Sequence, residues 1–321
     1  MLNLLENNFN ESLITQAKKN SWDHVFFVSN QTSLIISKLI IDNFKISLDN
    51  VRIISFRDID TSLIKIEPFK VKVNIFDSYL DKLLWTSLAG KRILRELSNS
   101  KSFILYVEWA SREAEKVLNS KNCRGHNYIE MGQHTYMQIP LFDPKKLSFV
   151  ERFKKNWKNT LSNIDEYAHY YYRNDVNSLI GINEEIFPLI SNQKKIILSN
   201  LNELKDIYSP KLNGIKVIGL TCASRRLKRD EWGNMIKKLI SKLPDNAIVK
   251  LHPSFTTNLK IFTEFRDLFY SITKNKFSLC DNDVILELEM LHEEKLIIGP
   301  QTSLSRYANQ LGSKFQKIEL Y

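Results

Sequence analysis

Cysteine is scarce in this chain, and the cysteines that occur are far apart. The 321 residues include only Cys123, Cys222 and Cys280, with no C-x-x-C spacing and no neighbouring pair of histidines. Neither a disulfide framework nor a Cys/His zinc site is therefore indicated. We predict a cytoplasmic protein, because the reducing cytoplasm is the simplest location for such thiols.

Long apolar runs and targeting segments are also lacking. The first twenty residues mix Glu6, Asn7, Asn8 and Lys18 among their leucines, which is not the pattern of a signal peptide. No stretch approaches the ~18 apolar residues that a membrane-spanning helix needs. There is no repeat of fixed period and no low-complexity tract, which argues against a solenoid.

Negative charge is in the minority. Lysine and arginine number 46 against 36 aspartates and glutamates, which gives a net charge of +10 and a pI near 9.3. Such a surface attracts anions, including nucleic acid, anionic lipid and nucleotide-activated acidic sugars. The basic residues cluster at 145–158 and at Arg225, Arg226, Lys228 and Arg229, which are equally explained as solvated helix faces. No nucleic-acid-binding motif is visible and the acidic residues are evenly spread, so we predict no nucleic-acid partner.

The chain has the length and the apolar content of two globular domains. Its 43% hydrophobic residues can form ordinary cores, and its length fits two domains of roughly 150 residues each. Short β-branched or aromatic runs alternate with helix-period segments, the pattern of parallel sheets covered by helices. The predicted strands are 24–29, 51–56, 71–76, 103–107, 216–220, 247–251, 276–279, 295–298 and 315–320; the predicted helices are 32–42, 79–97, 231–243, 259–272, 284–291 and 303–311.

The domain boundary is predicted where the composition changes. Residues 149–210 are rich in tyrosine, lysine and asparagine, contain Pro188 and Pro210, and lead to Asn213-Gly214 just before a strand. We expect an N-terminal domain over 1–175, a linker region over 176–213 and a C-terminal domain over 214–321.

Ligands of parallel α/β sheets bind beyond the carboxyl ends of the strands, so the residues that directly follow strands are the first candidates for a site. His252-Pro253 follows the strand predicted at 247–251, and the proline would end the strand with the imidazole at its tip. A histidine there can present a ring nitrogen to a phosphate, although a lone His-Pro is also common in ordinary turns.

Two further strand ends have chemically useful residues. Thr302-Ser303 follows the strand predicted at 295–298 and opens a helix, where hydroxyls and backbone N–H groups can bind an anion or simply cap the helix. Glu130 lies two residues before Gly132, on a backbone that can turn sharply and project the carboxylate into a cleft, and the alternative is a surface acid beside a turn.

In this order the three motifs resemble those of the bacterial GT-B sialyltransferases, whose marks are an acidic pair before glycine, a His-Pro and a Ser-Ser or Ser-Thr pair. The resemblance extends over most of the chain, since residues 27–32 are similar to the family's first strand and loop and residues 286–288 to its Pro-x-Glu segment. The chain departs from the pattern at Met131, Thr302 and Ile285. The resemblance implies an α/β fold of GT-B type, with two Rossmann-like domains facing a central cleft.

The same resemblance implies an inverting transfer of sialic acid from CMP-sialic acid to a glycan. Glu130 would be the general base, His252 would assist the leaving phosphate, Thr302 and Ser303 would bind that phosphate, and Glu287 would bind the ribose, with Glu289 as the fallback. Lys250 and Pro253 would line the nucleotide site; the secondary candidates are Asn30, Gln31, Thr32, His134, Arg225 and Arg226. No metal and no cofactor is implied, and we interpret Asp281-Asn282-Asp283 as a helix cap rather than a metal motif.

Acceptor and location are expectations from the family alone. The expected acceptor is the terminal galactose of a lipid-diphosphate-linked precursor of O-antigen, capsule or lipooligosaccharide. The expected location is in peripheral contact with the anionic inner face of the cytoplasmic membrane. Residues 149–173 are basic and aromatic enough for that contact, or they form a plain interdomain helix. Two rival functions fit the sequence: a GT-B transferase of CDP-glycerol or another polyol phosphate, and a non-enzymatic basic protein that binds nucleic acid.

Overall fold

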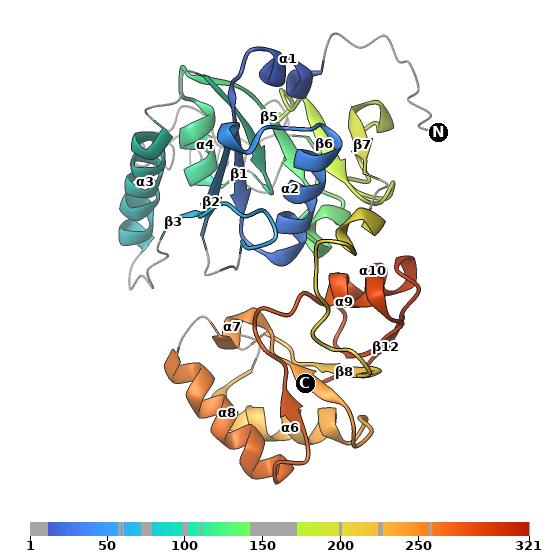
Figure 1. The fold of residues 1–321 in the computed structure, drawn as a ribbon. Coiled ribbons are helices and arrows are strands. Elements are labelled where there is room, and N and C mark those ends of the chain that lie inside the picture. Colours follow the sequence, from blue (N-terminus) through green and yellow to red (C-terminus); the bar gives the residue numbers. More distant parts are fainter. Residues whose placement is uncertain are drawn as a thin grey trace. The chain divides into compact units, whose positions relative to one another are not determined.

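The structure is a computed structural model that describes residues 12–56, 59, 61–71, 79–97, 102–109, 111–141, 172–198, 201–223, 227–256 and 259–320. The chain divides into two compact units, unit 1 (Met1–Ser199) and unit 2 (Asn200–Tyr321). Each unit contains one parallel sheet with helices packed on it (Figure 1). The predicted pair of α/β units is confirmed.

Unit 1 is built on a seven-stranded sheet with the strand order β3-β2-β1-β4-β5-β6-β7, and adjacent strands are parallel. Every residue of β1 and β4 is buried, as expected for central strands covered on both faces. The strands are β1 (Asp23–Val28), β2 (Val51–Ser55), β3 (Phe69–Lys70), β4 (Phe103–Val107), β5 (Cys123–Ile129), β6 (Ser178–Gly181) and β7 (Lys195–Ile197).

The helices of unit 1 cover this sheet. Figure 1 shows α2 on one side of the sheet and α3 with α4 on the other. A capping box between Asn30 and Ser33 starts α2, and Ser111 caps α4. The two short helices α1 and α4 and the strands β3 and β5 were not predicted, and most of the strand predicted at 71–76 lies outside the described residues. The helices are α1 (Leu13–Lys19), α2 (Gln31–Asn43), α3 (Tyr79–Glu96) and α4 (Arg112–Leu118), with 3-10 turns at Leu48–Asn50, Gln133–Tyr136 and Asn192–Lys194.

Unit 2 has a five-stranded parallel sheet in the order β10-β9-β8-β11-β12. Its core includes four packed aromatic rings, those of Trp232, Phe255, Phe265 and Phe269. The strands are β8 (Val217–Leu220), β9 (Ile248–Lys250), β10 (Ser278–Leu279), β11 (Leu296–Gly299) and β12 (Lys314–Lys317). The helices are α6 (Trp232–Ile240), α7 (Pro253–Thr256), α8 (Leu259–Thr273), α9 (Leu286–His292) and α10 (Leu304–Gln310), with 3-10 turns at Leu201–Leu204 and Arg229–Glu231.

The predicted linker over 176–213 is not a separate region in the structure. Its first part supplies β6 and β7 to the sheet of unit 1. Its last part belongs to unit 2, where the buried carboxylate of Glu289 accepts hydrogen bonds from the Tyr208 hydroxyl and from the backbone N–H groups of Lys211 and Leu212. The boundary between the two units therefore lies between Ser199 and Asn200. The sequence did not predict β6 and β7, because strands of four and three residues give too short a pattern to recognise between polar turns.

Within the described ranges, every helix is too short or too polar to cross a lipid bilayer.

Candidate functional site

Three loops meet at the carboxyl edge of the sheet in unit 2. Strand β8 lies between β9 and β11, and the loops that leave β8, β9 and β11 begin at Thr221, Leu251 and Pro300. All the strands run in the same direction, so these loops emerge at the same edge. Strands are spaced about 4.8 Å apart, so β9 and β11 lie roughly 10 Å from each other across β8. The two predicted motifs therefore follow strands that end at the same edge of the sheet.

The backbone of His252 is held firmly at this edge. The buried hydroxyl of Thr221 accepts a hydrogen bond from the His252 N–H at 2.8 Å. On the other side, the His252 carbonyl accepts from Phe255 N at 2.9 Å, and the Phe255 ring is fully buried in the core. β9 ends at Lys250, one residue before the predicted end, and Pro253 begins α7.

The ring of His252 is oriented by Ser254. The Ser254 N–H donates to Nδ1 at 3.1 Å, and the Ser254 hydroxyl lies 2.9 Å from the same nitrogen. A backbone N–H can only donate, so Nδ1 is the acceptor and the neutral ring bears its proton on Nε2. The donor N–H of the neutral ring is therefore at Nε2.

Neither hydroxyl of the Thr302-Ser303 pair caps the helix that follows. Ser303 is the N-cap residue of α10 but makes no side-chain cap hydrogen bond. The Thr302 Oγ1 atom is buried and has no hydrogen-bond partner among the described residues. A buried hydroxyl without a partner costs free energy, so it needs a specific explanation. The capping interpretation is therefore wrong for these side chains.

The remaining candidates of unit 2 have other partners. The half-buried Lys250 donates from Nζ to the carbonyls of Asp281 and Asn282, at 2.5 and 3.0 Å, and burial lowers its pKa below the usual value. Glu287 lies in the first turn of α9, and its side chain is half-buried. Glu289, the fallback, is fully buried and binds the segment that enters unit 2, so it is not available to a ribose.

The helix-cap interpretation of residues 281–283 is wrong. The N-cap of α9 is Ile285, and the carboxylate of Asp283 instead binds the ammonium group of Lys211. Within the described residues, no group of three or more His, Cys, Asp or Glu side chains is arranged to hold a metal ion.

In unit 1, Glu130 directly follows β5, and its carboxylate is fully buried. Oε1 accepts a hydrogen bond from the Tyr136 hydroxyl at 2.5 Å, and Oε2 accepts from the Ile182 N–H at 2.8 Å. Gly181 makes room for this carboxylate, because a Cβ atom there would lie 2.4 Å from Oε2. Glu130 is not the surface acid that the alternative interpretation of the sequence expected.

The loop after β1 contacts a second acid that sequence reasoning missed. Glu108 directly follows β4, is buried, and accepts hydrogen bonds from both the N–H and the hydroxyl of Ser29. Asn30 caps α2 with its side chain and also donates to the Met131 carbonyl at 3.2 Å. The strand-end rule that identified Glu130 would have identified Glu108 as well, since 103–107 was predicted as a strand.

The secondary candidates have different surroundings. Gln31 and Thr32 form the first turn of α2, and Thr32 is buried. His134 lies in the 3-10 turn after β5, is exposed, and meets the ring of Trp109 edge-on at 5.8 Å. Arg225 and Arg226 lie outside the described residues, as do the basic cluster at 145–158 and nearly all of 149–173.

Comparison with known proteins identifies the fold and no family. No protein-family model matches this sequence, and no curated protein matches it. Among solved structures, the S. aureus MnaA–UDP complex aligns with a TM-score of 0.53 and 10% identity, over 93% of this chain and 79% of that one. UDP-GlcNAc 2-epimerase from Neisseria meningitidis, bound to UDP-GlcNAc, aligns with a TM-score of 0.51 and 10% identity, over 92% and 82%. UDP-N-acetylglucosamine 2-epimerase from Rickettsia bellii gives 0.51 and 11%, over 93% and 79%.

These alignments cover both units and agree with the two parallel sheets and their connecting helices. The chain therefore has the α/β fold of GT-B type, with two Rossmann-like domains.

Proposed function

We propose that this protein is an enzyme that uses a sugar nucleotide, and specifically an inverting sialyltransferase that transfers sialic acid from CMP-sialic acid to a glycan. One observation is the main support. The edge of the unit 2 sheet combines an oriented imidazole N–H donor with two hydroxyls that are not used as helix caps. The solved proteins of similar fold include complexes with UDP and with UDP-GlcNAc, which supports a nucleotide-sugar ligand.

The reaction releases CMP, whose phosphate gains negative charge as the bond to the sugar breaks. His252 would donate from Nε2 to a phosphate oxygen, and Thr302 and Ser303 would donate to the others. Donors held in place before the reaction stabilise the developing charge without a cost of reorganisation. Glu287 would bind the ribose hydroxyls, and in this proposal no metal ion and no cofactor is required.

Glu130 would accept the proton of the acceptor hydroxyl. Its carboxylate is fully buried and accepts hydrogen bonds at both oxygens, so the acceptor can reach it only after the covering side chains move. The Tyr136 hydroxyl is the donor that can swing away, because the other donor, Ile182 N–H, belongs to the backbone. The acceptor we propose is a terminal galactose on a lipid-linked precursor of a surface polysaccharide.

A second candidate follows from the comparisons. The similar solved structures include UDP-GlcNAc 2-epimerases, which favours a UDP-N-acetylhexosamine as the ligand in place of CMP-sialic acid. The phosphate-binding groups of unit 2 would serve either nucleotide. The two candidates differ in the nucleobase, cytosine or uracil, and in the sugar, sialic acid or an N-acetylhexosamine.

A binding panel tests the proposal. The melting temperature of the protein is measured with CMP, UDP and CDP-glycerol at equal concentrations, and the dissociation constants are measured by calorimetry. We expect CMP to stabilise the protein most, because a ligand that binds only the folded state raises its apparent stability. Stabilisation by UDP without stabilisation by CMP would replace sialyl transfer with the second candidate, and a response to CDP-glycerol alone would favour polyol-phosphate transfer.

A further inference from the structure

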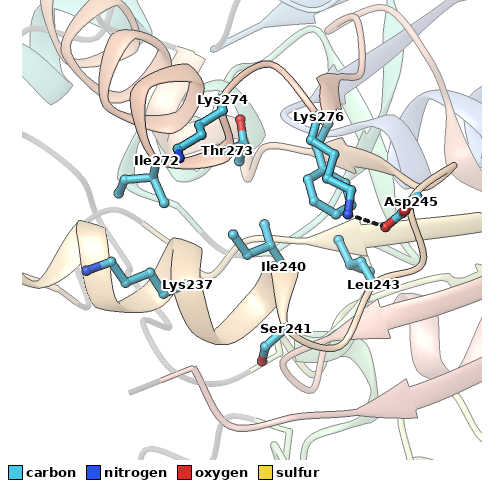
Figure 2. A pocket seen from close by; sticks show the side chains of 10 residues that line it. Lys237, Ile240, Ser241, Leu243, Asp245, Ile272, Thr273, Lys274 and Lys276 are labelled. Atoms are coloured by element: carbon cyan, nitrogen blue, oxygen red, sulfur yellow. Dashed lines mark ion pairs between the residues drawn. The ribbon is translucent and has the colours of Figure 1, made fainter.

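A pocket of about 550 Å³ lies in unit 2, away from the edge that has His252 and Thr302. It is lined by the C-terminal turns of α6 and α8 and by the loops that lead into β9 and β10 (Figure 2). Leu243 and Phe277 precede those strands, so the pocket lies at the amino edge of the sheet. The proposed nucleotide site is at the opposite, carboxyl edge.

The rim of the pocket is positively charged. It includes Lys237, Lys274 and Lys276 against one carboxylate, Asp245, which pairs with Lys276 at 2.6 Å. Lys237 and Lys274 form no ion pair within the described parts of the chain. Cations near the ends of α6 and α8 also complement the helix dipoles, which alone would account for the lysines. The helix dipoles do not account for two other features of the pocket, an unpaired hydroxyl and an apolar wall.

A buried hydroxyl in the pocket lacks a partner. Thr273 is 5% exposed, and its Oγ1 atom has no hydrogen bond among the described residues. Buried hydroxyls in folded proteins are nearly always paired, with protein groups or with ordered water. The Oγ1 atom is itself closed off from solvent, so an anion in the pocket could accept from it only after the side chain rotates about χ1.

The pocket also has an apolar wall. Ile240 and Ile272 are only partly buried and lie across the pocket from each other, and Figure 2 shows Ile240 extending from α6 towards Ile272 and Thr273. Leu243 and Phe277, which are buried, also line the pocket. Inorganic phosphate gains nothing from contact with these side chains, whereas the glycerol and acyl carbons of a lipid do.

We propose that this pocket binds the phosphate head group of an anionic phospholipid. Lys237 and Lys274 would contact the phosphate, Thr273 would donate to it after rotation of its side chain, and Ile240 and Ile272 would contact the adjacent carbon chain. The site is separate from the sugar-nucleotide site, and the inference does not depend on which donor the enzyme uses. It gives unit 2 a membrane-contact site of its own, distinct from residues 149–173.

Vesicle binding of the full-length protein tests this proposal. Sedimentation is compared with vesicles of phosphatidylcholine alone and of phosphatidylcholine mixed with phosphatidylglycerol. The double variant K237E/K274E should bind the anionic vesicles at least about tenfold more weakly, because each juxtamembrane lysine contributes about a factor of five. Thr273→Val preserves the shape of the side chain and should weaken binding by up to about tenfold.

The matched control is K238E/K242E, which makes the same change in net charge at the same end of α6 with residues that do not line the pocket. It should weaken binding several-fold less than the pocket variant does, because exposed charges outside the pocket act on the vesicle only through a screened field. An equal loss in the control and the pocket variant would overturn the proposal, since the attraction would then be a general property of the surface. Complete release of the protein from vesicles by millimolar inorganic phosphate would also overturn it, because the pocket would then bind the free anion rather than a lipid.

Discussion

The carboxyl edges of the two sheets differ in how far their polar groups are already paired. In unit 1 the two acids at strand ends are buried and bonded: Glu108 accepts from Ser29, and Glu130 accepts from Tyr136 and Ile182. In unit 2 the Thr302 hydroxyl has no partner among the described residues and Ser303 makes no cap.

This difference has a physical consequence for substitutions. Residues in a completed network stabilise the fold, and removing one leaves buried donors unpaired at a cost of about 1–3 kcal/mol each. Residues left unpaired at a folded edge contribute little to stability and can give their full interaction to a ligand. Substitution of Glu130 in unit 1 should therefore lower both stability and turnover. Substitution of Thr302 or Ser303 in unit 2 should lower binding or turnover with little change in stability.

The largest expected effect is on turnover. His252→Ala and Glu130→Ala should each lower kcat about a hundredfold or more, because each removes a group that handles a proton or the leaving charge. Steady-state kinetics with CMP-sialic acid measure this effect. Near wild-type turnover of either variant would remove that residue from the reaction.

The same pair of variants separates the two edges by stability. Glu130→Ala leaves the Tyr136 hydroxyl and the Ile182 N–H without their acceptor and should destabilise the fold by about 2–5 kcal/mol. His252→Ala should destabilise it by less, because the backbone hydrogen bonds of His252 remain. Urea unfolding measures both values, and equal destabilisation would break the comparison.

The next effect is on nucleotide affinity. Thr302→Val combined with Ser303→Ala should weaken CMP binding at least about tenfold, since a hydrogen bond to a charged group contributes about 1.5–3 kcal/mol. The melting temperature without ligand should change little, because valine keeps the shape of threonine and removes an unpaired hydroxyl. Ser305→Ala is the control: its hydroxyl donates to the Thr302 carbonyl at 2.8 Å, so it should lower stability more than affinity. Unchanged CMP affinity in the double variant would move the phosphate site elsewhere.

A smaller effect concerns pH and unit 1. Burial lowers the pKa of His24 and of His126 to about 4, whereas a histidine in the unfolded chain titrates near 6.5. The unfolded chain therefore takes up protons first, and stability present above pH 6.5 is lost as the pH falls towards 4. Between pH 7 and about pH 5.5 each histidine should cost about 1 kcal/mol. Hydrogen exchange of the β4 and β5 amides measures this loss of stability. The variant His24→Phe should remove about half of it. An undiminished loss of stability in that variant would contradict this explanation.

The smallest expected effect is that of metal removal. In our account, the hydroxyls and the imidazole N–H of unit 2 neutralise the leaving phosphate. EDTA should therefore leave kcat within about twofold of its untreated value, because an imidazole and hydroxyls supply the charge stabilisation that a bound cation would otherwise provide. An absolute requirement for magnesium or manganese would be incompatible with this part of the account.

The sequence predicts the strands and the longer helices of unit 2 well, because both depend on local patterns, whereas in unit 1 it misses β3, β5, β6 and β7. Buried runs such as 103–107 and the proline after His252 are visible in the sequence itself. The pairing of the polar groups is not visible there, since Ile182 is 52 residues from Glu130 and Ser29 is 79 residues from Glu108. The short strands β6 and β7 were missed for a related reason: contact with the rest of the sheet, rather than their own pattern, makes them strands.

The most direct test of the central claim is a transfer assay. The protein is incubated with CMP-sialic acid and a panel of galactosides, and in parallel with UDP-GlcNAc alone, and the products are identified by mass spectrometry and NMR. We predict a sialylated galactoside and stoichiometric CMP, with no change in UDP-GlcNAc. Intact CMP-sialic acid together with epimerised UDP-GlcNAc would contradict the account.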